Sequence, residues 1–245
     1  MRDLSAEHLV ALAATAGVSA LLVAGARRGG VGGGGFSHAA RLALGAVILA
    51  GFATEQLAYA ERGLWSARVN LPLQLSDAVA LVSVVALWRP RQALVELVYY
   101  WAFAATLQAL LTPDLRQAYP DVLYFTYFTT HGGALAAACL LVLGERRRPR
   151  AGSALRAYAV TAGFAVLAAV ATLATGGNYL FLRRKPAGGS LLDAMGPWPV
   201  YIAAAAALGL VLFLLLEALA RHYPGPDAQG TARTGRRAAG RDARG

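Results

Sequence analysis

Seven long apolar stretches are the feature of this 245-residue chain that most limits its possible folds. A bilayer core about 30 Å thick needs about 20 apolar residues in a helix. Each stretch approaches or meets that length, and none alternates with the period of a barrel strand. We therefore expect an all-α fold, a polytopic bundle of seven transmembrane helices, over residues 5–26, 39–60, 71–88, 94–111, 123–143, 155–175 and 198–220.

The first stretch is expected to be a retained helix and not a signal peptide. Asp3 and Glu7 stand where a signal peptide carries basic residues, and the apolar run is too long for its core. The chain has one cysteine, Cys139, so an internal disulfide cannot staple the fold. Cys139 lies among Ala and Leu and is expected to be a small core residue.

The charged residues predict the orientation of the helices. The net charge of +10 comes mainly from arginines that follow the first, third, fifth and seventh stretches. Cytoplasmic loops collect Lys and Arg, so we expect the N-terminus outside and the C-terminus inside a cell membrane. This placement argues against nucleic acid as the partner. Three cations in the loop after the sixth stretch, Arg183, Arg184 and Lys185, are the exception, because they fall on the expected outside.

Composition divides the chain into one domain and a tail. Residues 1–223 are expected to form the transmembrane domain, with a Gly-rich cytoplasmic linker at residues 27–38. Residues 224–245 are Gly-, Ala- and Arg-rich without periodicity, and we expect a disordered basic cytoplasmic tail. The sequence has no nucleotide-binding or metal-binding motif, so neither a cofactor nor a metal site is expected.

Polar side chains inside the stretches are few, and such residues normally face the interior of a bundle. Glu217 and Arg221, four residues apart, are expected to pair at the cytoplasmic end. For Glu55 and Glu96, pairing with arginine and a functional role are both open. The other polar residues at this depth are Gln56, Gln74, Ser76, Asp77, Gln108 and His131.

His131 has two interpretations. Tyr124, Tyr127 and His131 share one helical face, and Gly132 and Gly133 allow neighbouring helices to approach closely. The histidine is either a hydrogen-bonded core residue or part of a functional site that includes Tyr127.

The segment NLPLQLSD, residues 70–77, places polar side chains at the start of the third stretch. Gln74 and Asp77 share a face, and Ser76 lies beside Asp77, turned by about 100°. A helix cap explains an acid in the first turn but not Gln74 and Ser76 together. Since the third and fifth stretches both start outside, Ser76 and His131 are expected at similar depths, on the side of the Arg183–Lys185 loop. A hydroxyl, an imidazole and cations at one level suit acyl or phosphate-ester chemistry.

Four motifs in order carry a resemblance to a known family: NLPLQLSD (70–77), ELVYYWAFAATLQALLTPDL (96–115), FTTHGG (128–133) and GGNYLFLRRKP…SLLD..GPWPVY (176–201). The chain resembles the bacterial YwaF-type integral membrane proteins, relatives of the eukaryotic transmembrane protein 164 family, over residues 50–220. The resemblance implies a seven-helix fold. For the eukaryotic branch it implies an acyltransferase that moves a fatty acyl chain from a phospholipid to a lysophospholipid.

The resemblance also implies roles for individual residues. Ser76 takes the place of the family's nucleophilic cysteine, and His131 takes the place of its histidine. Because a hydroxyl needs an aligned base, either His131 activates Ser76 or the site binds lipid without an acyl-enzyme. The supporting polar residues are Gln74, Asp77, Glu96, Gln108 and Tyr127, of which Asp77 or Gln74 orients the imidazole or donates to the oxyanion. Their charge alone, and not the resemblance, assigns the lipid phosphate to Arg183, Arg184 and Lys185, with Asn178 and Tyr179 shaping the pocket mouth.

Two other classes of protein fit the same residues. A proton-coupled transporter or small-molecule receptor would use Glu55, Asp77, Glu96 and His131 as a relay. A structural or assembly factor would use them only to hold helices together. The expected partners are membrane phospholipids, with a lysophospholipid acceptor if acyl transfer occurs.

Overall fold

The structure is a computed structural model that describes residues 5–29, 35–115, 117–186 and 190–222, and these residues form helices and connecting loops without strands. The all-α prediction is confirmed, and a helix lies at each of the seven predicted stretches. The fourth and fifth are interrupted by wider π-helical turns, η1 and η2. The elements are α1 (Ala6–Arg28), α2 (Gly35–Glu61), α3 (Leu75–Trp88), α4 (Gln92–Trp101), η1 (Ala102–Thr106), α5 (Leu107–Leu111), α6 (Val122–Ala138), η2 (Cys139–Gly144), α7 (Ser153–Thr175), η3 (Tyr179–Phe181), η4 (Leu191–Met195) and α8 (Val200–His222).

Six of the described helical segments are long and apolar enough to cross a membrane, and α3 is shorter. Its 14 residues span about 21 Å, less than the bilayer core. The prediction that this helix begins at residue 71 is wrong, because helical structure starts at Leu75. Pro72 disfavours the helical conformation at Leu71, and the N–H of Leu71 bonds to the side chain of Tyr179 instead.

The predicted glycine linker is shorter than its range of 27–38. Arg27 and Arg28 belong to α1, and residues 35–38 form the first turn of α2. Residues 30–34 and the predicted tail, 224–245, lie outside the described residues.

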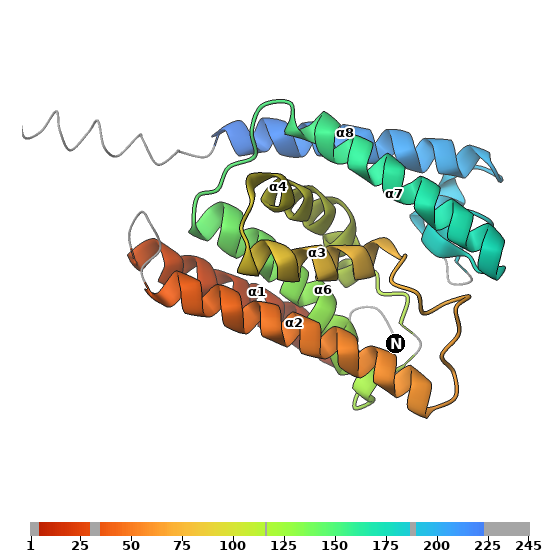
Figure 1. The fold of residues 1–245 in the computed structure, drawn as a ribbon, viewed down its shortest axis with the longest axis horizontal. Helices are drawn as coiled ribbons and strands as arrows, with labels where there is room; N and C mark the ends of the chain where they lie inside the picture. Colours follow the sequence, from red (N-terminus) through yellow and green to blue (C-terminus); the bar gives the residue numbers. More distant parts are fainter. Residues whose placement is uncertain (1–4, 30–34, 116, 187–189, 223–245) are drawn as a thin grey trace, which may run out of the picture.

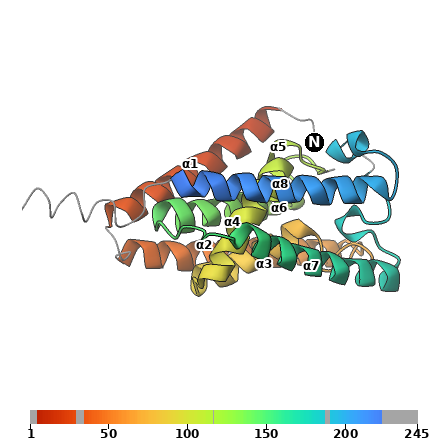
Figure 2. The ribbon, with the colours of Figure 1, turned by 90° about the horizontal axis from the view of Figure 1, so that it is seen from above.

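The helices are arranged in three layers (Figure 1; Figure 2 shows the view from above). The middle layer contains α3, α4 and α6, which supply most of the buried apolar core. One outer layer holds α1 and α2, and the other holds α7 and α8. We call the two ends of the bundle the loop end, with connections 62–74, 112–121 and 176–199, and the arginine end, with connections 89–91 and 145–152. That the arginine end faces the cytoplasm stays a prediction.

Small residues let α6 approach both helices of the first layer. A Cβ added at Gly132 would lie 2.7 Å from Thr15 Oγ1 of α1, and one added at Gly133 would lie 2.6 Å from Ile48 Cγ1 of α2. Such contacts permit only glycine at these positions, since real Cβ atoms do not approach so closely. The expectation that these two glycines allow close packing is confirmed.

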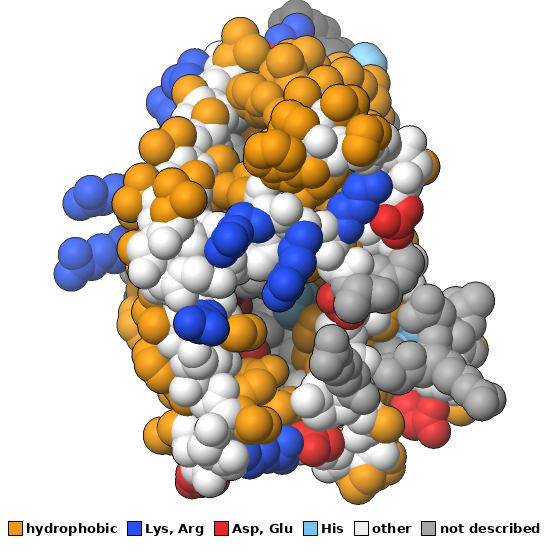
Figure 3. Space-filling view, turned by 90° about the vertical axis from the view of Figure 1, so that its right-hand side faces the viewer, with side chains coloured by type: hydrophobic (Ala, Val, Ile, Leu, Met, Phe, Trp, Pro, Cys, Tyr) orange, Lys and Arg blue, Asp and Glu red, His pale blue; other side chains and the backbone are white. Residues whose placement is uncertain are grey.

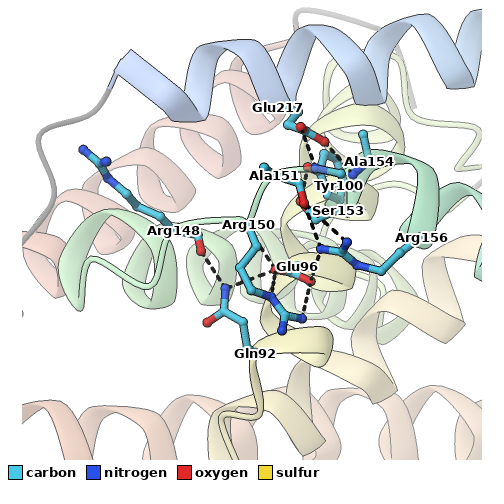
Figure 4. A network of polar contacts seen from close by, with 11 residues as sticks. Gln92, Glu96, Tyr100, Arg148, Arg150, Ala151, Ser153, Ala154, Arg156 and Glu217 are labelled. Carbon is cyan, nitrogen blue, oxygen red and sulfur yellow. Dashed lines mark hydrogen bonds and ion pairs between the residues drawn. The ribbon is translucent and has the colours of Figure 1, made fainter.

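At the arginine end, buried carboxylates join α7 to its neighbours (Figure 4). The Glu96 carboxylate of α4 accepts hydrogen bonds from Arg150 Nε at 2.8 Å and Arg150 Nη2 at 3.0 Å. The hydroxyl of Tyr100, one turn further along α4, lies 2.7 Å from Ser153 Oγ at the start of α7. Of the two interpretations of Glu96, the structure therefore shows the pairing with arginine.

Glu217 of α8 completes this junction. Its carboxylate accepts from Gly152 N and Ala154 N, both at 2.9 Å, and pairs with Arg221 at 2.5 Å. The predicted pair with Arg221 is confirmed, whereas the two backbone bonds were not predicted. These N–H groups belong to the first turn of α7, where a helix leaves donors unpaired and favours a negative charge.

Replacing Glu217 by alanine is expected to lower the free energy of unfolding by about 2 kcal/mol, since two backbone donors and Arg221 lose a charged acceptor. Titration with sodium dodecyl sulfate measures this free energy. Glu61→Ala, an exposed carboxylate at the end of α2, is the matched control. Equal stability of the two variants would contradict the role given to Glu217.

Candidate functional site

The candidate site lies at the loop end, where the segment Asn178–Leu182, here called the strap, is docked on the start of α3. The N–H of Leu180 donates to Gln74 Oε1 at 3.0 Å. The hydroxyl of Tyr179 accepts from Leu71 N at 3.1 Å and donates to Ala67 O at 2.7 Å. Burial raises the pKa of the Tyr179 phenol, which keeps it a hydrogen-bond donor. The strap thus supplies partners for the backbone that precedes α3.

The strap is held in a conformation that ordinary residues avoid. Leu180 and Phe181 have φ angles of 52° and 56°, in the left-handed region that costs a non-glycine residue about 1 kcal/mol or more. Their neighbours are fixed as well: Trp198 Nε1 donates to Leu182 O at 3.1 Å, and the Tyr201 hydroxyl donates to Phe181 O. Strain held in place by several partners is typical of functional sites.

The cationic loop that follows the strap is organised by Asn178. Asn178 Oδ1 accepts from the backbone N–H groups of Arg183 at 2.9 Å and Arg184 at 3.2 Å, and its Nδ2 donates to Arg184 O at 2.8 Å. Asn178 and the fully buried Tyr179 therefore position the backbone of this loop and of the segment before α3. The side chains of Arg183 and Arg184 are exposed. Lys185 lies 3.8 Å from Asp193 Oδ1 and above the ring of Tyr201.

Ser76 and Asp77 face different neighbours because they lie about 100° apart on α3. Ser76, itself half-buried, shares its helical face with Ala80, Ser83 and Leu87, whose exposed fractions are 0, 0 and 1%. This is the face of α3 that is directed into the bundle. Asp77 is directed toward α2, and its carboxylate interacts electrostatically with Glu55 and with the backbone N–H of Gln74.

His131 is stacked on Tyr127 within α6. The two ring centroids lie 4.0 Å apart at an interplanar angle of 24°, and Tyr127 donates its hydroxyl to Ala109 O of α5 at 2.7 Å. His131 Nδ1 lies 2.9 Å from Tyr127 O. A carbonyl oxygen only accepts, so Nδ1 carries the proton and Nε2 of the neutral ring carries a lone pair.

Counting residues from the arginine end places Ser76 and His131 at similar depths. The loops that follow α3 and η2 are in contact at that end, because Arg147 Nη1 donates to Pro90 O at 3.4 Å. Ser76 lies 12 residues before Trp88, the end of α3, and His131 lies 13 residues before Gly144, the end of η2. At 1.5 Å per residue, both lie about 18–20 Å from the arginine end.

Two of the residues predicted to support the site, Glu96 and Gln108, lie apart from Ser76, Asp77 and His131. Glu96 is bound to Arg150 at the arginine end, and the side chain of Gln108 on α5 is exposed. Glu55 of α2 lies among the group instead, since its charge acts on both Asp77 and Tyr127. Glu55 was one of several polar residues in the sequence, and only its partners on other helices distinguish it.

The loop end is hollowed in its centre (Figure 3). Lys and Arg side chains stand around the hollow, and histidine and acidic side chains are visible within it. A separate apolar groove of about 640 Å³ lies between α1, α2 and α6 and includes Thr129 and Gly132. Thr129 lies about 160° and Gly132 about 100° around α6 from His131.

Replacing Gln74 by leucine is expected to free the amide of Leu180, because the acceptor at 3.0 Å is lost. Hydrogen exchange of that amide should become about fivefold faster, the effect of one ordinary hydrogen bond. Gln108→Leu, the same change at an exposed position, serves as the control. An unchanged exchange rate in Gln74→Leu would show that this bond does not hold the strap.

Among the comparisons with known proteins, only the one with sequence models of protein families finds a match for this chain. No curated protein and no solved structure matches it. The sequence model of the TMEM164 family matches residues 4–217, which is most of the chain and all of its helices up to the Glu217 junction. The apolar surfaces of α1, α7 and α8 contact membrane lipid, as the exposed Val10 and Leu173 do with exposed fractions of 68 and 79%. The chain is a polytopic integral membrane protein and belongs to the TMEM164 family.

Proposed function

We propose that this protein is a lipid-ester enzyme that transfers a fatty acyl chain from a phospholipid to a lysophospholipid, with Ser76 as nucleophile and His131 as base. The observation that carries the proposal is the docking of the cationic loop on the start of α3. The Gln74–Leu180 bond ties the expected phosphate contacts to the helix that bears Ser76. A lipid whose phosphate is bound at the loop would have its ester groups directed into the hollow.

His131 is suited to act on a hydroxyl. Its Nδ1–H is committed to Tyr127 O, which leaves the Nε2 lone pair to accept a proton. Tyr127, itself anchored to α5, holds the ring by stacking. A fixed tautomer and a fixed ring are the requirements for a base that activates a serine.

In the first half-reaction, Ser76 Oγ attacks the ester carbonyl carbon of the donor while His131 Nε2 takes the hydroxyl proton. The tetrahedral intermediate collapses, the bond to the lysophospholipid oxygen breaks, and that oxygen takes the proton from His131. In the second half, a hydroxyl of the acceptor gives its proton to His131 and attacks the acyl-serine ester. The new ester leaves, and Ser76 regains its proton.

The oxyanion would form beside the first turn of α3. Ser76 is the second residue of this helix, where backbone N–H groups have no helical acceptor. Because Gln74 Oε1 is bound to Leu180, the Gln74 amide N–H groups remain for the oxyanion. Asp77 interacts with Gln74 N and so stabilises the same turn.

One observation favours the second candidate function, a proton-coupled transporter or receptor without covalent chemistry. Glu55 and Asp77 interact at membrane depth, and no described cation forms an ion pair with either. Adjacent carboxyl groups of this kind exchange protons readily. This function requires the carboxylates and does not require Ser76.

Acyl exchange between phosphatidylglycerol and a labelled lysophospholipid, measured on the purified protein in nanodiscs, separates the two functions. Ser76→Ala and His131→Ala are expected to lower the rate at least about 100-fold, since a nucleophile or its base is lost. Ser76→Cys should retain turnover, because a thiol is the better nucleophile. Thr54→Ala, which removes an exposed hydroxyl of α2, should match the wild type.

Turnover that survives in Ser76→Ala would contradict the proposed enzyme. Proton uptake by vesicles containing the protein, lost in Asp77→Asn but kept in Ser76→Ala, would establish the transporter instead.

A further inference from the structure

Besides the three cations that are expected to contact the lipid phosphate, the loop end carries a further exposed arginine, Arg68. Arg68 lies beside the strap, although its place in the chain is more than a hundred residues away. Its carbonyl oxygen would lie 2.4 Å from a Cβ at Gly177, and its Nε 3.8 Å from a Cβ at Gly176. Gly176 ends α7 with a φ of 71°, so only glycines allow this contact.

The position of Arg68 is fixed on both sides. Asn70 Oδ1 accepts from Ser66 N at 2.9 Å, and Tyr179 donates to Ala67 O at 2.7 Å. The turn that carries Arg68 is thus joined to the strap. Arg183 and Arg184 follow the strap directly in the sequence. We call Arg68, Arg183 and Arg184 the cationic rim, and Figure 3 shows Lys and Arg side chains gathered around the hollow of this face.

The rim has excess positive charge. All three side chains are exposed, and none forms an ion pair with a carboxylate of the described residues. The acid nearest to the loop in sequence, Asp193, is already paired with Lys185 at 3.8 Å. At the arginine end, by contrast, Arg150 and Arg221 each pair with a buried carboxylate.

We infer that the cationic rim selects phospholipids whose head group is purely anionic, of the phosphatidylglycerol class, over zwitterionic ones. Three unpaired cations favour a phosphate without a neighbouring ammonium. A zwitterionic head group would bring its ammonium among three guanidinium groups, and each of them repels it. This inference rests on the proposed function and names its substrate class, with Arg68 as a specificity-determining residue.

The test uses the purified full chain in phosphatidylcholine nanodiscs with increasing fractions of phosphatidylglycerol, and it measures lipid binding by the shift in the unfolding temperature. Wild type is expected to bind phosphatidylglycerol at least tenfold more tightly than phosphatidylcholine. Arg68→Gln and Arg184→Gln should each weaken that preference about fivefold, the effect of one charge near a membrane surface. Arg89→Gln, an exposed arginine at the other end, is the matched control.

Equal binding of the two lipids by wild type would overturn the inference, and so would equal losses in Arg68→Gln and Arg89→Gln. Equal stabilisation by soluble glycerol phosphate would overturn the assignment to a lipid. Ser76→Ala is expected to keep the preference for phosphatidylglycerol. If the rim variants lose the lipid preference but keep acyl exchange, the proposed enzyme still stands. If wild type shows the lipid preference but no acyl exchange, only the proposed enzyme is refuted.

Discussion

The hydrogen bond from Leu180 N to Gln74 Oε1 joins the cationic loop to the start of α3, the two parts of the structure on which the proposed function depends. Backbone groups inside a membrane must find partners within the protein. Because α3 begins only at Leu75, the backbone before it needs acceptors and donors from elsewhere. Tyr179 of the strap accepts from Leu71 N and donates to Ala67 O, while Gln74 Oε1 accepts from the N–H of Leu180. A shortened helix is stabilised in this way, and its first turn lies within the bundle beside a cationic loop.

The carboxyl groups at the two ends of the bundle have different interaction partners. At the arginine end, Glu96, Glu145 and Glu217 are each paired with arginine, and two of them also accept backbone N–H groups of the loop before α7 or of its first turn. Toward the loop end, Glu55 interacts electrostatically with Asp77 and Tyr127, and no described cation forms an ion pair with Glu55 or Asp77. The first arrangement holds helices together. The second leaves carboxyl groups without an ion pair at membrane depth, where proteins retain ionisable residues mainly for function.

The helices could be predicted from the sequence because long apolar runs and the length of a bilayer determine them independently of tertiary contacts. The glycines at 132 and 133 could be predicted for the same reason, since their effect is local to α6. The start of α3 could be predicted only in part, because Pro72 is a local signal whereas the bond from Leu71 N to Tyr179 joins residues 108 positions apart. The pairing of Glu55 with Asp77 and the place of Arg68 beside Gly177 depend likewise on contacts between distant segments.

The central claim is that Ser76 and His131, on two helices, meet in one hollow. Cross-linking with a short dithiol-bridging reagent tests it most directly, in a chain with Cys139→Ser. The pair Ser76→Cys with His131→Cys is predicted to cross-link efficiently. Ser76→Cys with Thr129→Cys, which lies about 160° around α6 from His131, is predicted not to react. Cross-linking of the second pair alone would contradict the shared hollow and the chemistry proposed for it.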